Sequence, residues 1–228
     1  VDELNPSYLD YIIRNKNSVI EKWLKLGAGG WRLDVADELP DEFIKILKKK
    51  LKEVKSDGVL IGEVWEDASN KVSYNRKREY LFGNELDSVT NYPLRQIILD
   101  LVRNYIASKY FIRKYLSLKE NYPKEYFYST MNMLGNHDTE RVLTMLNNNV
   151  NLLKEAVVIQ MTLPGVPLIY YGDEAGLCGF TDPDNRRTYP WGREDYQMID
   201  FHRVMIRIHK QYEVLKTGSL AFLWNDYQ

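Results

Sequence analysis

Short apolar runs alternate along the chain with longer amphipathic stretches, and this alternation limits the fold more than any other feature of the sequence. The runs predict five strands, and the stretches between them recur at helical spacing. Such an order is typical of βα units around a parallel sheet, so we predict an α/β fold. The predicted strands are 30–35, 59–64, 86–90, 130–135 and 167–172, and the predicted helices are 8–26, 41–54, 93–107, 109–119, 150–162 and 196–216.

The charge balance excludes two classes of partner. The 228 residues carry a formal net charge of −1, from 31 basic and 32 acidic residues spread along the chain. No basic field exists to attract nucleic acid or an anionic membrane. The most apolar stretch, 156–171, contains Gln160, Thr162 and two prolines. It therefore cannot supply the roughly 20 uninterrupted apolar residues of a membrane span.

Cysteine and histidine usage bears on metal sites and disulfides. Cys178 is the single cysteine, which excludes an internal disulfide, and the three histidines are scattered. We therefore expect no zinc site, and more generally no metal ligands.

The first candidate site residues lie in Gly-Gly-Trp-Arg-Leu-Asp-Val at 29–35. The period of two along a strand places Arg32 and Asp34 on one face. Near the C-terminal end of a barrel strand, a guanidinium beside Asp34 would keep that carboxylate ionised, as a nucleophile requires. The alternative interpretation is a buried ion pair that only connects strands.

The second candidate is Glu63 in Val-Leu-Ile-Gly-Glu-Val-Trp at 59–65. Apolar surroundings favour the protonated form of a carboxyl group, which is the form that a general acid needs. Gly62 is expected to leave room for a ligand, and Trp65 offers an aromatic face. Taken alone, Glu63 could equally be a surface glutamate at a strand end.

The third candidate closes Met-Asn-Met-Leu-Gly-Asn-His-Asp at 131–138. Here Asn136, His137 and Asp138 follow an apolar run, although a histidine beside an aspartate is commonly no more than a satisfied turn. Three carboxylates at the ends of three barrel strands would face one mouth of the barrel. Glycoside hydrolysis needs one carboxyl to protonate the leaving oxygen and another to attack the anomeric carbon.

Together these segments resemble the α-amylase superfamily, in particular its neopullulanase and cyclomaltodextrinase branch. Residues 27–38 are similar to the family's nucleophile motif, 62–65 to its acid/base motif, and 136–138 to its third-carboxylate motif. The resemblance implies Asp34 as nucleophile, Glu63 as general acid/base and Asp138 as the residue that binds and distorts the sugar. Arg32, His137 and Asn136 are then supporting contacts.

Two later segments extend the resemblance. Residues 165–174 resemble the last barrel strand, and 182–187 resemble a loop whose Asp182 and Arg186 would contact sugar. The implied fold is a partial TIM (β/α)8 barrel comprising about the last five βα units, residues 1–218, followed at 219–228 by the start of a C-terminal β-domain. The family's first three strands and inserted loop domain have no counterpart in the sequence.

The function implied is retaining hydrolysis of α-1,4-linked glucans by the complete enzyme, without metal or organic cofactor, the chain alone being inactive. Two alternatives stay open. One is a transglycosylase of the same family, and the other is a catalytically silent carbohydrate-binding or assembly module. The partners expected are an α-glucan or oligosaccharide, no nucleic acid, no membrane, and a second copy of the chain paired through the open barrel edges. The resemblance favours a cytoplasmic location over secretion.

Overall fold

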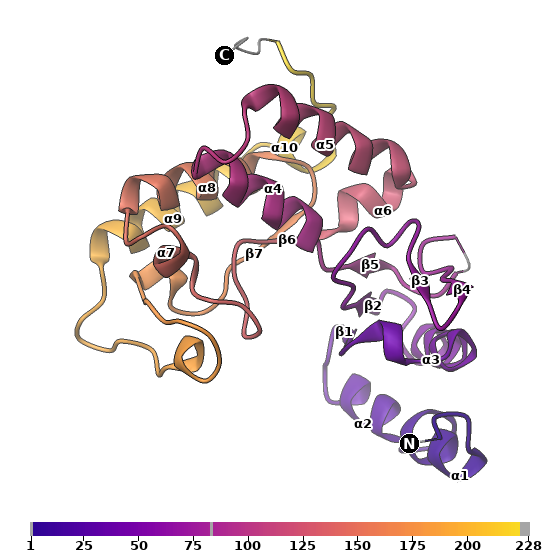
Figure 1. Cartoon of the computed structure of the whole chain (residues 1–228). Coiled ribbons are helices and arrows are strands. Elements are labelled where there is room, and N and C mark those ends of the chain that lie inside the picture. Colours follow the sequence, from indigo (N-terminus) through magenta and orange to yellow (C-terminus); the bar gives the residue numbers. More distant parts are fainter. Residues whose placement is uncertain (1, 83, 224–228) are drawn as a thin grey trace. The chain divides into compact units, whose positions relative to one another are not determined.

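The computed structural model describes residues 2–82 and 84–223, which form two compact units. Among the described residues, unit 1 comprises 2–82, 84–90 and 121–130, and unit 2 comprises 91–120 and 131–223. Each unit contains parallel strands with helices packed on them (Figure 1).

Unit 1 contains a parallel sheet with the order β1-β2-β5. The register pairs Gly30 with Val59 and Leu33 with Gly62, so β1 and β2 end at the same level. The three strands lie side by side in Figure 1. The strands of unit 1 are β1 (Gly30–Leu33), β2 (Val59–Gly62), the antiparallel hairpin of β3 (Val72–Ser73) and β4 (Arg76–Lys77), and β5 (Ser88–Val89).

Helix α3 (Asp41–Val54) lies where periodicity predicted a helix. Phe43, Ile44, Leu47 and Leu51 are buried along one face, and acidic Asp41 and Glu42 occupy the first turn, where the helix dipole favours negative charge. The other helices of unit 1 are α1 (Pro6–Leu9), a π-helical turn (Asp10–Arg14), α2 (Val19–Lys25), a 3-10 turn (Ala36–Glu38) and α6 (Lys124–Ser129).

The prediction of one continuous helix over 8–26 was wrong. Asn17 has a φ of 68°, which no right-handed helix accommodates, and Ser18 begins α2 by accepting a hydrogen bond from the Glu21 amide at 3.4 Å. The apolar spacing continues across this break, and both segments bury apolar residues: Leu9 and Ile13 before it, and Ile20 and Leu24 after it. Gly27, with a φ of 105°, ends α2 as expected.

Unit 2 contains the parallel pair β6 (Met131–Met133) and β7 (Val166–Leu168). Helix α8 (Val150–Thr162) has the predicted bounds, and the Asn149 side chain caps it by accepting from the amides of Asn151 and Leu152. The other elements are α4 (Tyr92–Val102), α5 (Ser108–Asn121, its last residue in unit 1), α7 (Val142–Met145), 3-10 turns at Asp173–Ala175 and Asp184–Arg186, α9 (Tyr196–Gln211) and α10 (Val214–Thr217).

The C-terminal expectations were partly wrong. The helix expected over 196–216 breaks at Tyr212, whose backbone is extended, so α9 and α10 are separate. Residues 220–223 form no strand, and 224–228 lie outside the described residues, as does part of the range expected to begin a β-domain.

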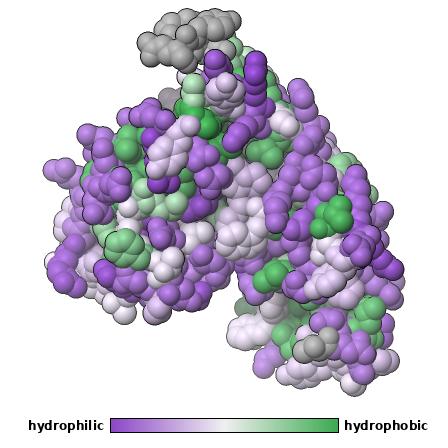
Figure 2. Space-filling view, viewed as in Figure 1, coloured by the Kyte–Doolittle hydropathy of each residue, from purple (hydrophilic) through white to green (hydrophobic). Residues whose placement is uncertain are grey.

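No helix within residues 2–82 and 84–223 is long and apolar enough to cross a membrane. On the face drawn in Figure 2, hydrophobic residues form separate patches among hydrophilic ones.

Candidate active site

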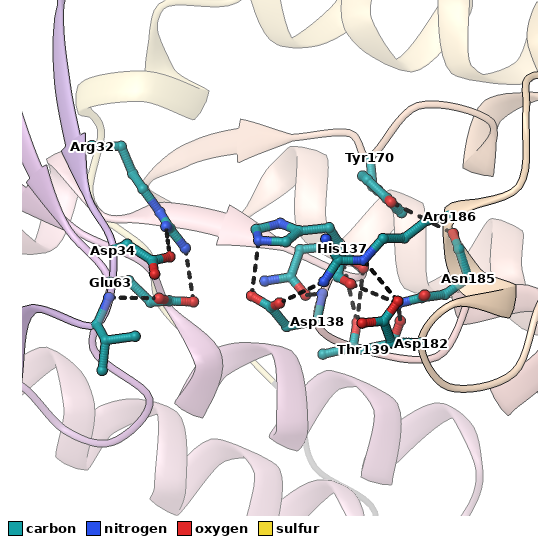
Figure 3. Close-up of polar contacts among 12 residues, drawn as sticks. Arg32, Asp34, Glu63, His137, Asp138, Thr139, Tyr170, Asp182, Asn185 and Arg186 are labelled. Carbon is teal, nitrogen blue, oxygen red and sulfur yellow. Dashed lines mark hydrogen bonds and ion pairs between the residues drawn. The ribbon is translucent and has the colours of Figure 1, made fainter.

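Arg32 connects two carboxylates in unit 1. Its guanidinium forms an ion pair with Asp34 through Nη1 and lies 2.8 Å from Oε1 of Glu63 through Nη2 (Figure 3). Asp34 lies in the turn just after β1, and its contact with Arg32 shows that the two side chains point to the same side, as predicted. The contact with Glu63 was not predicted, since it depends on the parallel register between β1 and β2.

The two carboxylates differ sharply in exposure. Glu63 is only 2% exposed, whereas the Asp34 side chain is 73% exposed. The Glu63 carboxylate also accepts a hydrogen bond from the Val35 amide at 2.9 Å. Unit 1 therefore holds one buried, well-oriented carboxyl group and one open carboxylate on a shared cation.

Val35 owes its role to its backbone conformation. Its φ of 38° lies in the left-handed region, which is unusual for a β-branched residue. This turn directs the Val35 amide towards Glu63. Val35 was not predicted as a site residue, because its main-chain amide makes the contact and the identity of its side chain does not indicate this.

The expectation that Gly62 leaves room for a ligand was wrong. A Cβ at Gly62 would lie 2.5 Å from Cδ1 of Leu86, so the buried Leu86 side chain already fills that space. The amide of Val64, just before Trp65, donates to the Thr90 hydroxyl at 3.1 Å and fixes the chain after β2. Trp65 itself is exposed and follows this fixed segment.

The second cluster lies in unit 2, directly after β6. The buried Asn136 amide donates to the hydroxyl of Tyr92 at 2.5 Å, and its Oδ1 accepts from the Asp138 amide at 3.1 Å. Nε2 of His137 lies 3.1 Å from Oδ2 of Asp138. The predicted trio therefore forms a tight turn that presents a half-buried carboxylate.

Residues of the 182–187 loop join this second cluster. Arg186 lies between two carboxylates, at 3.4 Å from Oδ1 of Asp138 and 3.1 Å from Oδ1 of Asp182 (Figure 3). Asn185 also contacts the cluster and was not singled out in the sequence. Its side-chain amide donates to the carbonyl of His137 at 2.7 Å and to that of Thr139 at 2.8 Å.

A buried ion pair lies behind the second cluster. Arg141 and Asp173 meet at 3.0 Å. Burial raises the pKa of Asp173 to about 7, and the charge of Arg141 opposes that rise. No group of three or more His, Cys, Asp or Glu suited to a metal ion occurs within the described ranges.

Comparison with known proteins gives a consistent result. Residues 8–212 match the family described as alpha amylase, catalytic domain. The chain is 38% identical over 250 residues to an amylopullulanase of Thermoanaerobacter thermohydrosulfuricus, and the match covers 96% of this chain and 16% of that protein. It is 35% identical to a cyclomaltodextrinase of Thermoanaerobacter pseudethanolicus, with 96% and 37% covered.

Among solved structures, a cyclomaltodextrinase matches with a TM-score of 0.88 and 32% identity, covering 97% of this chain and 36% of that one. This match confirms the predicted α/β fold, part of a TIM barrel. The chain thus spans well under half the length of these relatives.

Proposed function

Because the chain belongs to the family of alpha-amylase catalytic domains and covers part of such a domain, we propose that the whole protein containing it is a retaining glycoside hydrolase of α-linked glucans. The relatives' names refer to pullulan and cyclic maltodextrins, and we propose these glucans and linear maltooligosaccharides as substrates. In this proposal Asp34 attacks the anomeric carbon, and Glu63 protonates the leaving oxygen and then activates water.

The observation that carries the proposal is the shared contact of Asp34 and Glu63 with Arg32. Two carboxylates that touch one guanidinium are close neighbours, which suits a retaining enzyme, whose carboxyl groups lie only about 5–5.5 Å apart. Their exposures suit their roles. Open Asp34 can reach a sugar, and enclosed Glu63 is held in one orientation by Arg32 and the Val35 amide.

The cluster around Asp138 supports the same chemistry. An oxocarbenium-like transition state carries positive charge, and a fixed carboxylate stabilises it more than it stabilises the neutral substrate. Arg186 and His137 hold Asp138 from two sides. We propose that Asp138 binds and distorts the reacting sugar, and that Asn136, His137, Asp182, Arg186 and Trp65 complete the contacts with substrate.

The experiment is an assay of the whole protein on maltotriose, cyclodextrin and pullulan beside its Asp34→Asn and Glu63→Gln variants. The matched control is Asp57→Asn, which changes an exposed aspartate of the same unit. We expect the control to keep parental turnover and both active-site variants to lose it. Parental turnover by Asp34→Asn would refute the assignment.

The same assay separates hydrolysis from transglycosylation. Added acceptor sugar would shift the products of a transglycosylase towards longer oligosaccharides and leave those of a hydrolase unchanged. A protein that binds glucan without any turnover would instead be a silent binding module.

A further inference from the structure

The side chain of Asn185 clamps the main chain on both sides of Asp138. Its amide group donates to the carbonyls of His137 and Thr139, the two residues that flank Asp138 (Figure 3). Both hydrogen bonds are short, at 2.7 and 2.8 Å, and Asn185 is fully buried. One side chain, 46 or more residues away in sequence, thus holds the carbonyl just before Asp138 and the carbonyl of the residue just after it.

Asn185 is itself held by buried Arg141. Nε of Arg141 donates to the Asn185 carbonyl at 2.8 Å, and Nη1 donates to the Tyr171 carbonyl and to Asp173. The guanidinium also lies over the ring of Tyr170, 4.0 Å from its centroid. Arg141 is thus held by contacts with Tyr170, Tyr171 and Asp173, and it holds the carbonyl of Asn185 in turn.

The turn at 136–139 also contains hydrogen bonds of its own, but these do not hold it against the rest of unit 2 as the bonds from Asn185 do. The Asp138 amide binds Asn136, and the Thr139 amide lies 3.4 Å from the Asn136 carbonyl, so both contacts stay within the turn. They shape the turn but do not attach its far side to the rest of unit 2. Asn185 supplies a main-chain attachment there, beside the ion pair between Arg186 and Asp138, and it belongs to the 3-10 turn that also carries Arg186.

We propose that Asn185 is a positioning residue for Asp138, and that it couples this carboxylate to the loop bearing Asp182 and Arg186. A change at Asn185 should rotate or shift Asp138 away from Arg186 without removing any charge from the site. The structural part of this proposal stands on the contacts of unit 2 alone, and its kinetic consequence rests on the proposed function.

The direct test compares crystal structures of this chain with those of Asn185→Asp and Asn185→Ala. Asn185→Asp keeps the shape of the side chain but replaces its donor by an oxygen that faces two carbonyls, and Asn185→Ala removes the group without adding charge. We expect Asp138 to lose its contacts of 3.1 Å with His137 and 3.4 Å with Arg186 in whichever variant folds. Unchanged contacts in a folded variant would overturn the proposal.

The kinetic test uses the whole protein. A displacement of about 1 Å can cost on the order of 100-fold in rate, so we expect kcat to fall by that order in Asn185→Asp while KM changes much less. The matched control is Asn149→Ala, which removes a helix cap of the same unit and lowers thermal stability. The control should keep parental kcat. An equal loss of kcat in both variants would show that Asn185 acts only through stability.

Failure of the proposed function and failure of the positioning role of Asn185 can be distinguished. A parent protein without glycosidase activity would refute the proposed function, and the crystal structures would still decide whether Asn185 positions Asp138.

Discussion

Arg32 lies on β1 and Glu63 directly follows the neighbouring parallel strand β2, and their side chains meet at 2.8 Å. The same guanidinium binds Asp34, so the cation orients two carboxylates of unequal exposure. Glu63 is buried and Asp34 is open to solvent, and the shared arginine prevents their charges from driving them apart. This geometry is the physical basis of the proposed division of roles.

Replacing Arg32 by lysine should disrupt both carboxylates together. A lysine ammonium is a point charge on a flexible stem and does not reproduce the planar fork that reaches Asp34 and Glu63. We expect kcat/KM of the whole protein to fall on the order of 100-fold, the cost of losing one oriented donor in an active site. Arg76→Lys, an exposed change in β4 of the same unit, is the control and should have no effect. Parental kcat/KM in Arg32→Lys would contradict the role given to this residue.

Replacing Val35 by glycine should stabilise unit 1. A β-branched residue at a φ of 38° is strained by about 1–3 kcal/mol, whereas glycine adopts this conformation freely at an entropic cost of about 0.5–1 kcal/mol. We expect the free energy of unfolding, measured with urea, to rise by about 1 kcal/mol. Val72→Gly in β3, where no positive φ occurs, should lower it by a similar amount. A loss of stability in both variants would show that Val35 is not strained.

Buried Glu85 should make the stability of unit 1 depend on pH. Its carboxylate accepts no hydrogen bond from the described residues and lies 3.5 Å from Lys45. Burial, followed by the negative charge of Asp41, raises the pKa of Glu85 from 4.5 to about 7. The folded state therefore binds this proton more tightly than the unfolded state. The contribution of Glu85 to the free energy of unfolding is largest below pH 4.5. It falls as the pH rises towards 7, by about 3 kcal/mol at most.

Glu85→Gln should flatten this decline, because glutamine does not titrate. The control is Glu79→Gln, which also changes a partner of Lys45, but at a position where the side chain is mostly exposed. We expect urea unfolding between pH 4.5 and 7 to show the decline in the parent and the control but not in Glu85→Gln. Identical slopes in all three proteins would refute the assignment to Glu85.

Local patterns predicted those parts of the fold that local forces determine. Helices α3 and α8 have the predicted bounds because each combines buried apolar residues with a local start signal, an acidic first turn in α3 and the Asn149 cap in α8. The short hairpin of β3 and β4 was missed, since its turn depends on Tyr74 and Asn75 adopting positive φ within a polar stretch. The break at Asn17 was missed for a similar reason: apolar periodicity does not report backbone conformation.

In the candidate site, too, local patterns predicted the residues but not the contacts between distant segments. Asp34, Glu63 and Asp138 were predicted as site residues from their positions at strand ends, and the pairing of Arg32 with Asp34 was predicted from strand alternation. The contacts of Arg32 with Glu63 and of Asn185 with the turn around Asp138 connect segments far apart in sequence. Gly62 was misinterpreted because only the tertiary fold reveals that Leu86 fills its space.

The chain alone should be inactive and should self-associate. Within the described residues, β1 pairs only with β2 and β7 only with β6, so each has an unpaired edge. Exposed strand edges promote pairing between chains. We expect no turnover of maltooligosaccharides or cyclodextrin by the purified chain, and particles larger than 26.9 kDa in sedimentation. Turnover that disappears in Glu63→Gln would contradict the first expectation, and a monomer the second.

The central claim is that Asp34 forms a covalent bond with the sugar. The most direct measurement is to incubate the whole protein with a 5-fluoro-α-glycosyl fluoride, which forms a glycosyl-enzyme intermediate faster than water can break it down, and to map the adduct by peptide mass spectrometry. We expect a single adduct on Asp34, no adduct in Asp34→Asn, and an α-configured first product from normal substrate. An adduct on another residue, or a β-configured first product, would contradict the central claim.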